Sequence, residues 1–65
     1  MSTPLTDDEL ALLALLARGL STDLVARTLG LSERTVRRRT RTICDRLDVD
    51  TPVEAVAWAA RRRLV

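Results

Sequence analysis

Apolar residues recur along this chain at the three- and four-residue spacing of amphipathic helices, and short polar stretches divide them into four segments. The pattern predicts helices over about residues 7–18, 21–29, 32–47 and 52–63. No stretch alternates apolar and polar residues as a half-buried strand does, and no long linker or low-complexity tract separates the segments. We therefore expect one all-α, four-helix domain that spans residues 1–65.

Each predicted helix begins at a side chain that accepts hydrogen bonds from backbone N–H groups of the first turn. The four expected caps are Thr6, Ser21, Ser32 and Thr51. Glu9 and Glu54 lie three residues after the first and last caps, which is the spacing of a capping box. Gly19 and Gly30 supply the left-handed residue that ends many helices. These signals define helix ends, and only Ser32 has a second interpretation, because it opens the most basic helix.

The formal net charge of +2 hides an uneven distribution of charge along the chain. Residues 1–33 have a net charge of −3, and residues 48–65 are neutral. Residues 34–47 hold six arginines and one acid, a net charge of +5. One predicted helix therefore carries all of the excess positive charge.

This basic helix has one apolar and one arginine-rich face when its residues are placed at about 100° intervals. The apolar face carries Val36, Thr40, Ile43 and Leu47, and the opposite face carries Arg34, Arg37, Arg38 and Arg41. Guanidinium groups this close repel each other, and a polyanion reverses the sign of that cost. The major groove of B-DNA admits a helix, and arginine binds the guanine edge bidentately. The bland alternative is a solvated face with salt bridges to Glu33 or Asp45.

The spacing of three small or apolar residues relates the basic helix to the helix before it. Ala26 allows the two helices to approach closely, Gly30 makes the turn, and Val36 packs the basic helix on the helix before it. This is the spacing of a helix-turn-helix. Arg39 lies beside the apolar face, where such motifs usually have an apolar residue. We expect either that its head reaches a phosphate or that it extends to water.

The composition excludes several classes of protein. One cysteine and no histidine provide neither an internal disulfide nor a familiar metal site, so no metal or cofactor is expected. No phosphate loop or catalytic constellation supports an enzyme. The longest uncharged run near the start, Leu10 to Ala17, is too short for a membrane span and follows acids instead of the positive charges of a signal peptide. We expect a cytoplasmic protein.

Taken in order, the residues resemble the LuxR/GerE-type helix-turn-helix domain of bacterial transcription regulators, over Leu5 to Val65. The matching positions are Leu5-Thr6, Glu9, Leu12-Leu13, Leu15-Leu16-Ala17, Gly19-Leu20-Ser21, Val25-Ala26, Leu29, Leu31-Ser32, Thr35-Val36-Arg37, Ile43, Leu47, Glu54-Ala55-Val56 and Leu64-Val65. The chain departs from the family pattern at Asp8, Ala11, Leu24, Arg39 and Arg63, where Arg, Glu, Glu, His and Gly are common. A usual Arg is also absent near Pro52.

The resemblance implies a tetrahelical domain whose third helix enters the major groove of double-stranded DNA. It implies base contacts by Arg37, Arg38 and Arg41, and backbone contacts by Ser32 and Thr35. We also expect Arg34 and Arg39 at phosphates. The family usually carries this domain on a sensory or receiver module, which, with RNA polymerase, is a candidate partner.

The fourth predicted helix is the expected dimer interface, as the resemblance implies. Val53, Val56, Ala57 and Ala60 recur at helical spacing and predict a symmetric homodimer. Ala55 and Ala59 line another side and allow close helix approach. Trp58 is interpreted as a core or interface anchor, and Cys44 as a small apolar filler beside the core.

Two alternatives remain open at this point. One is a protein-interaction module in which the arginine face binds an acidic partner. The surplus leucines of the first helix favour it: Leu10, Leu12, Leu13, Leu15 and Leu16. The other is the related DNA-binding region of a sigma factor, against which the fourth-helix residues Glu54, Ala55 and Val56 argue.

Overall fold

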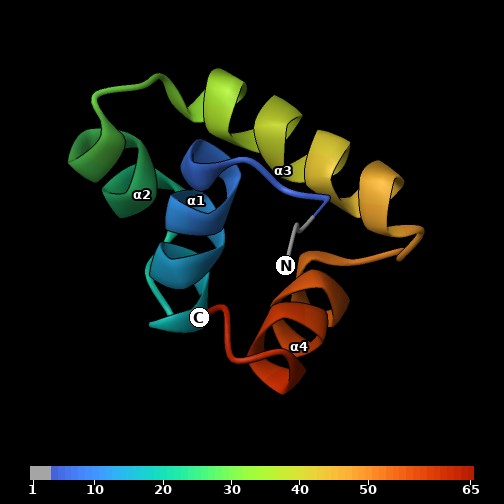
Figure 1. The fold of residues 1–65 in the computed structure, drawn as a ribbon. Coiled ribbons are helices and arrows are strands. Elements are labelled where there is room, and N and C mark those ends of the chain that lie inside the picture. Colours follow the sequence, from blue (N-terminus) through green and yellow to red (C-terminus); the bar gives the residue numbers. More distant parts are fainter. Residues whose placement is uncertain (1–3) are drawn as a thin grey trace.

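The computed structural model describes residues 4–65, and in this part of the chain it contains four helices and no strand (Figure 1). The helices are α1 (Asp7–Ala17), α2 (Thr22–Leu29), α3 (Glu33–Leu47) and α4 (Pro52–Arg61). The prediction of an all-α, four-helix fold is confirmed. The predicted helix bounds differ from these by no more than two residues at each end.

The helices begin at the predicted caps, with one correction. Thr6 Oγ1 accepts a hydrogen bond from Glu9 N at 3.2 Å, and Glu9 Oε1 accepts one from Thr6 N at 2.8 Å, so the first capping box is complete. Thr51 Oγ1 accepts from Glu54 N at 3.3 Å, but Glu54 Oε2 accepts from Asp50 N at 3.0 Å. The second predicted box is therefore only half formed. The φ of Thr51 is −133°, against −78° for Thr6, and this difference rotates the N–H of Thr51 relative to the helix.

All four helices end at a residue in the left-handed conformation, although only two glycines were expected there. These residues are Gly19, Gly30, Asp48 and Arg63, with φ of 80°, 68°, 57° and 56°. Short polar residues such as Asp48 visit this region at modest cost. Arg63 explains why α4 ends at Arg61 and not at residue 63: the N–H of Leu64 turns back to Ala59 O at 2.9 Å.

A left-handed arginine is strained, and this leads to a prediction. We expect Arg63→Gly to be more stable than Arg63→Ala by about 1 kcal/mol, because glycine has no Cβ to oppose this φ. At Arg61, the last residue of α4, the order should reverse, with alanine more stable than glycine by up to about 1 kcal/mol. Urea denaturation of the four variants measures both differences. The same order at the two positions would contradict a left-handed Arg63.

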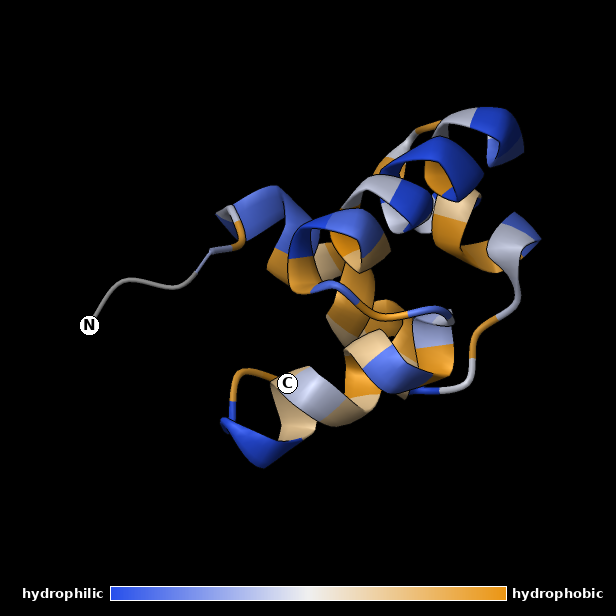
Figure 2. Ribbon diagram, turned by 90° about the vertical axis from the view of Figure 1, so that its right-hand side faces the viewer, coloured by the Kyte–Doolittle hydropathy of each residue, from blue (hydrophilic) through white to orange (hydrophobic). Residues whose placement is uncertain are grey.

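The core draws on every helix, and α1 packs against each of the other three. Its most buried members are Leu5, Leu12, Leu13, Val25, Ala26, Val36, Ile43, Cys44, Ala55 and Ala59. Figure 2 shows the apolar ribbon segments turned inward and the hydrophilic ones along the outside. Leu10, Leu15 and Leu16 are half-buried and also pack on this core. The first-helix leucines therefore do not form a free apolar face.

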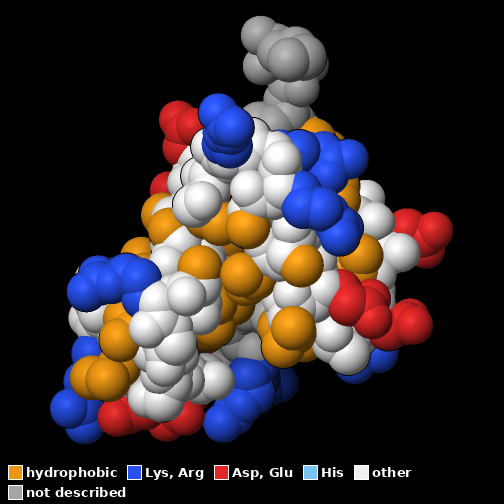
Figure 3. All heavy atoms as spheres, turned by 90° about the horizontal axis from the view of Figure 1, so that it is seen from below, with side chains coloured by type: hydrophobic (Ala, Val, Ile, Leu, Met, Phe, Trp, Pro, Cys, Tyr) orange, Lys and Arg blue, Asp and Glu red, His pale blue; other side chains and the backbone are white. Residues whose placement is uncertain are grey.

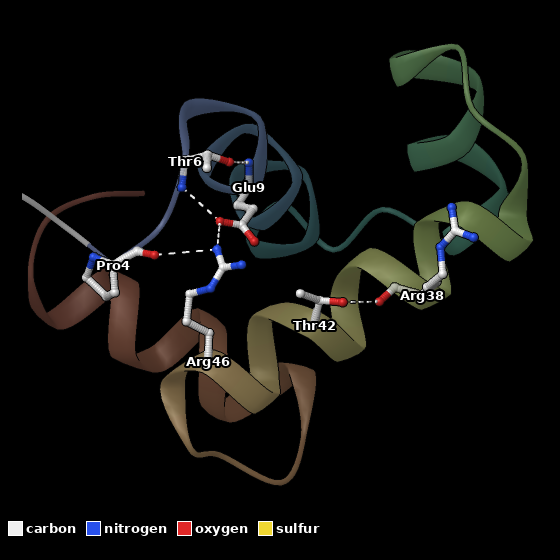
Figure 4. Close-up of polar contacts among 6 residues, drawn as sticks. All are labelled: Pro4, Thr6, Glu9, Arg38, Thr42 and Arg46. Carbon is white, nitrogen blue, oxygen red and sulfur yellow. Dashed lines mark hydrogen bonds and ion pairs between the residues drawn. The ribbon is translucent and has the colours of Figure 1, made fainter.

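A polar contact between α1 and α3 adds to the core (Figure 4). Arg46 Nη1 forms an ion pair with Glu9 Oε1 and donates to Pro4 O at 3.5 Å. The side chain of Glu9 is only 13% exposed. The same carboxylate thus caps α1, as predicted, and also fixes the C-terminal half of α3 against it, a contact that was not predicted from the sequence.

Candidate nucleic-acid interface

The turn between α2 and α3 has the predicted helix-turn-helix geometry. Ala26 and Val36 are 4% and 1% exposed, so the two helices meet there. Gly30 is left-handed, and Leu31 N donates to Ala26 O at 2.8 Å across the turn. This packing holds α3 along one side of the molecule, with its outer face away from the other helices (Figure 1).

Two hydroxyl groups lie together at the N-terminus of α3. Ser32 Oγ accepts from Thr35 N at 3.1 Å and donates to Thr35 Oγ1 at 2.9 Å. Ser32 is exposed and Thr35 is half-buried. Both side chains were predicted to lie near phosphates, and the structure brings them together at the positive end of the α3 dipole, which favours an anion.

The arginine face of α3 consists of Arg34, Arg37, Arg38 and Arg41, and all four residues are exposed. The buried residues of the same helix, Val36, Ile43 and Cys44, lie on the side that faces the core. Within residues 4–65, the side chains of Arg34, Arg38 and Arg41 form no hydrogen bond or ion pair. Guanidinium groups that are exposed, adjacent and unneutralised are suited to a polyanion.

One member of the arginine face has a partner on the same helix. Arg37 Nη2 lies 3.3 Å from Glu33 Oε1, one helical turn earlier. Glu33 and Asp45 were the two acids expected as alternative partners of the arginine face, and Glu33 is the one that forms an ion pair with it. Asp45 forms none among the described residues.

Arg39 lies on a flank of α3 and not on its arginine face. It is exposed and borders a groove with Asp8 and Glu9 of α1. The remaining lining residues are Thr6, Leu12, Leu29, Thr42 and Arg46. Two departures from the family pattern, Asp8 and Arg39, thus border the same groove with opposite charges. The position beside the apolar face is as expected, and a phosphate contact by Arg39 stays a prediction.

The opposite flank of α3 is lined by Arg37 and Arg41. A second groove lies on this flank, between α3, the C-terminal half of α1, the start of α2 and the segment that leads into α4. Its other lining residues are Leu16, Thr22, Val36, Thr40, Cys44, Asp45, Val49, Asp50 and Pro52. Threonine hydroxyls on α3 bond to their own helix: Thr40 Oγ1 donates to Val36 O at 2.7 Å, and Thr42 Oγ1 to Arg38 O at 3.1 Å. These two hydroxyl donors are therefore used within the helix, whereas the guanidinium donors of Arg34, Arg38 and Arg41 have no partner in residues 4–65.

The residues predicted for the dimer interface lie on one side of α4, and one of them, Val56, also packs against the core. Val53 is 78% exposed, Ala60 is exposed, and Val56 and Ala57 are half-buried. Ala55 and Ala59 are fully buried on the inner side, as the close-approach interpretation requires. Seen from below, the molecule shows hydrophobic side chains gathered in the centre with charged ones around them (Figure 3).

The surroundings of Trp58 and Cys44 fit packing roles for both side chains. The Arg62 guanidinium lies 4.2 Å from the ring centroid of Trp58, which is half-buried. Burial raises the pKa of the Cys44 thiol, and the nearby carboxylates of Asp45 and Glu54 raise it further. The thiol therefore stays protonated at neutral pH, as suits a packing residue.

Residues 4–65 contain no cluster of three or more potential metal ligands, and none of the helices they form is long and apolar enough to cross a membrane. What the site offers is a short helix, a tight turn and a second helix with exposed arginines. This combination defines a helix-turn-helix DNA-binding domain.

Comparison with known proteins identifies the family. Residues 3–59 match the family described as "Bacterial regulatory proteins, luxR family". The chain is also 36% identical over 63 residues to the transcriptional regulatory protein YdfI of Bacillus subtilis (strain 168). This alignment covers 97% of the chain and 30% of YdfI. The chain belongs to the LuxR family of bacterial regulatory proteins, and it is a DNA-binding domain of a transcription regulator and not an enzyme.

Proposed function

We propose that this chain binds double-stranded DNA in a sequence-specific manner, with α3 in the major groove, as a homodimer on paired half-sites. The observation that carries the proposal is the arginine face of α3, which is exposed and mostly without internal partners. Phosphate contacts provide affinity, and contacts to base edges provide the choice of sequence.

Base readout is assigned to Arg37, Arg38 and Arg41. Four residues of helix rise by about 6 Å, so Arg37 and Arg41 are separated by close to two base-pair steps along a strand. Each guanidinium binds O6 and N7 of a guanine. The preferred half-site is therefore expected to contain guanines about two base pairs apart. Backbone contacts are assigned to Ser32, Arg34, Thr35 and Arg39.

Dimerisation is assigned to the outer side of α4. Val53 is a branched apolar side chain that is 78% exposed, and a partner that covers it gains the free energy of removing this surface from water. Ala57 and Ala60 leave room for a second helix to approach. A two-fold axis at this surface presents two copies of α3 to successive turns of one duplex face. The sensory or receiver module and RNA polymerase stay candidate partners of the longer protein, since the chain matches only 30% of YdfI.

Selection from a random duplex pool tests this function directly. We expect enrichment of guanine-containing half-sites in inverted orientation, with centres about 10 base pairs apart. Val53→Glu should keep the half-site and lose the fixed spacing, whereas Leu24→Glu, at an exposed residue of α2, should keep both. A single half-site from the unchanged chain would reject the dimer.

The acidic-partner alternative makes the opposite prediction for the same experiment. A protein-interaction module should give no enrichment and no binding to random duplex at low salt. Either result would overturn the proposed DNA-binding function, because an exposed arginine face with DNA-binding geometry must respond to phosphate charge.

A further inference from the structure

The ion pair between Glu33 and Arg37 distinguishes one arginine of the α3 face from the other three. Its two side chains are 47% and 67% exposed, so solvent and ligands have access to both. Glu33 is the first residue of α3, one turn before Arg37. A carboxylate therefore lies within the surface that is proposed to meet DNA, beside the hydroxyl groups of Ser32 and Thr35.

The pair affects random and specific DNA differently. Binding to random sequence depends on uncompensated positive charge, and Glu33 neutralises the charge of Arg37. Guanine recognition depends on directed N–H donors, of which a guanidinium has five. The pair engages Nη2 of Arg37 and leaves donors for guanine O6 and N7. It therefore weakens attraction to phosphates more than recognition of a base.

On this basis, we propose that Glu33 is a specificity-determining residue that acts through Arg37. Its carboxylate orients the guanidinium and lowers the affinity for random DNA, so that Arg37 contributes mainly where a guanine edge is present. This inference rests on the proposed DNA-binding function and adds to it an acidic residue among the expected contacts.

A second ion pair in the chain provides a matched control. Arg27 Nη2 lies 3.3 Å from Asp23 Oδ2 on α2, with the same four-residue spacing and comparable exposure. Neither residue belongs to the arginine face of α3. Glu33→Gln and Asp23→Asn each remove one negative charge and one such pair, and any effect on helix stability is similar in the two variants.

The experiment measures dissociation constants for the selected duplex and for random duplex over a range of salt concentrations. Glu33→Gln should bind random duplex about eightfold more tightly at 0.1 M salt, the effect of about one additional neutralised phosphate. Its preference for the selected duplex over random duplex should fall about fivefold to tenfold. Asp23→Asn should leave this preference unchanged.

The Arg37→Ala background tests whether Glu33 acts through Arg37. There, Glu33→Gln should no longer change the preference for the selected duplex. An equal fall in that background, or an unchanged preference in Glu33→Gln alone, would overturn the inference while the DNA-binding function stands. A chain that does not distinguish the selected duplex from random DNA before any substitution would overturn the function itself.

Discussion

Arg38→Ala and Arg41→Ala are each expected to weaken binding to the selected duplex by about 5-fold to 150-fold, equivalent to about 1–3 kcal/mol. Both side chains are exposed on the outer face of α3 and form no internal ion pair in residues 4–65. Truncation therefore removes donors that are free to reach a guanine edge, and it breaks no hydrogen bond or ion pair within residues 4–65. Arg37→Ala should also weaken binding, together with the loss of its pair with Glu33.

The control for this prediction is Arg61→Ala. Arg61 is the exposed last residue of α4, a helix that runs from the end of α3 away from it (Figure 1). Its removal changes the net charge by the same amount, so it should produce only a small, salt-dependent loss. Fluorescence anisotropy with selected and random duplexes measures both effects, and thermal melting checks the fold. Unchanged affinity of all three α3 variants would contradict the assigned base readout.

The fold could be predicted from sequence because its signals are local. A cap such as Thr6 and a turn residue such as Gly30 act within one helical turn, and helical spacing alone separates buried from exposed residues. The end of α4 was missed by two residues because no local rule places arginine in a left-handed conformation. Arg63 adopts it because the chain must return Leu64 to the core.

The candidate site could be predicted only as a face. Periodicity places Arg34, Arg37, Arg38 and Arg41 on one face, but it does not show which of these guanidinium groups forms an ion pair with a carboxylate. Helical spacing allows Glu33 to pair with Arg37, and it equally allows Asp45 to pair with Arg41. Among residues 4–65, only the first of these two pairs forms. The contact of Glu9 with Arg46 joins residues 37 positions apart, and only the packed fold brings them together. Long-range pairs of this kind have no signal in a single sequence.

Leu13→Ala is expected to unfold a large fraction of the protein. Leu13 is 0% exposed in α1, which packs against each of the other three helices. Truncating a leucine at such a site costs about 3–5 kcal/mol, since it loses burial and leaves a cavity. A single core in a domain of this size rarely supplies more than about 3–5 kcal/mol in total. Circular dichroism with urea titration should show a largely lost helical signal or a midpoint near zero urea.

The matched control is Leu24→Ala on α2, where the side chain is 45% exposed and the expected loss is within about 0.5 kcal/mol. Stability and function are linked here, because DNA binds the folded chain. At a concentration of 100 times its dissociation constant, the selected duplex should raise the free energy of unfolding of Leu13→Ala by about 2.7 kcal/mol. The helical signal should recover accordingly. Wild-type stability of Leu13→Ala would contradict the core assignment. If the selected duplex does not recover folding of Leu13→Ala, the expected link between DNA binding and the folded state is contradicted.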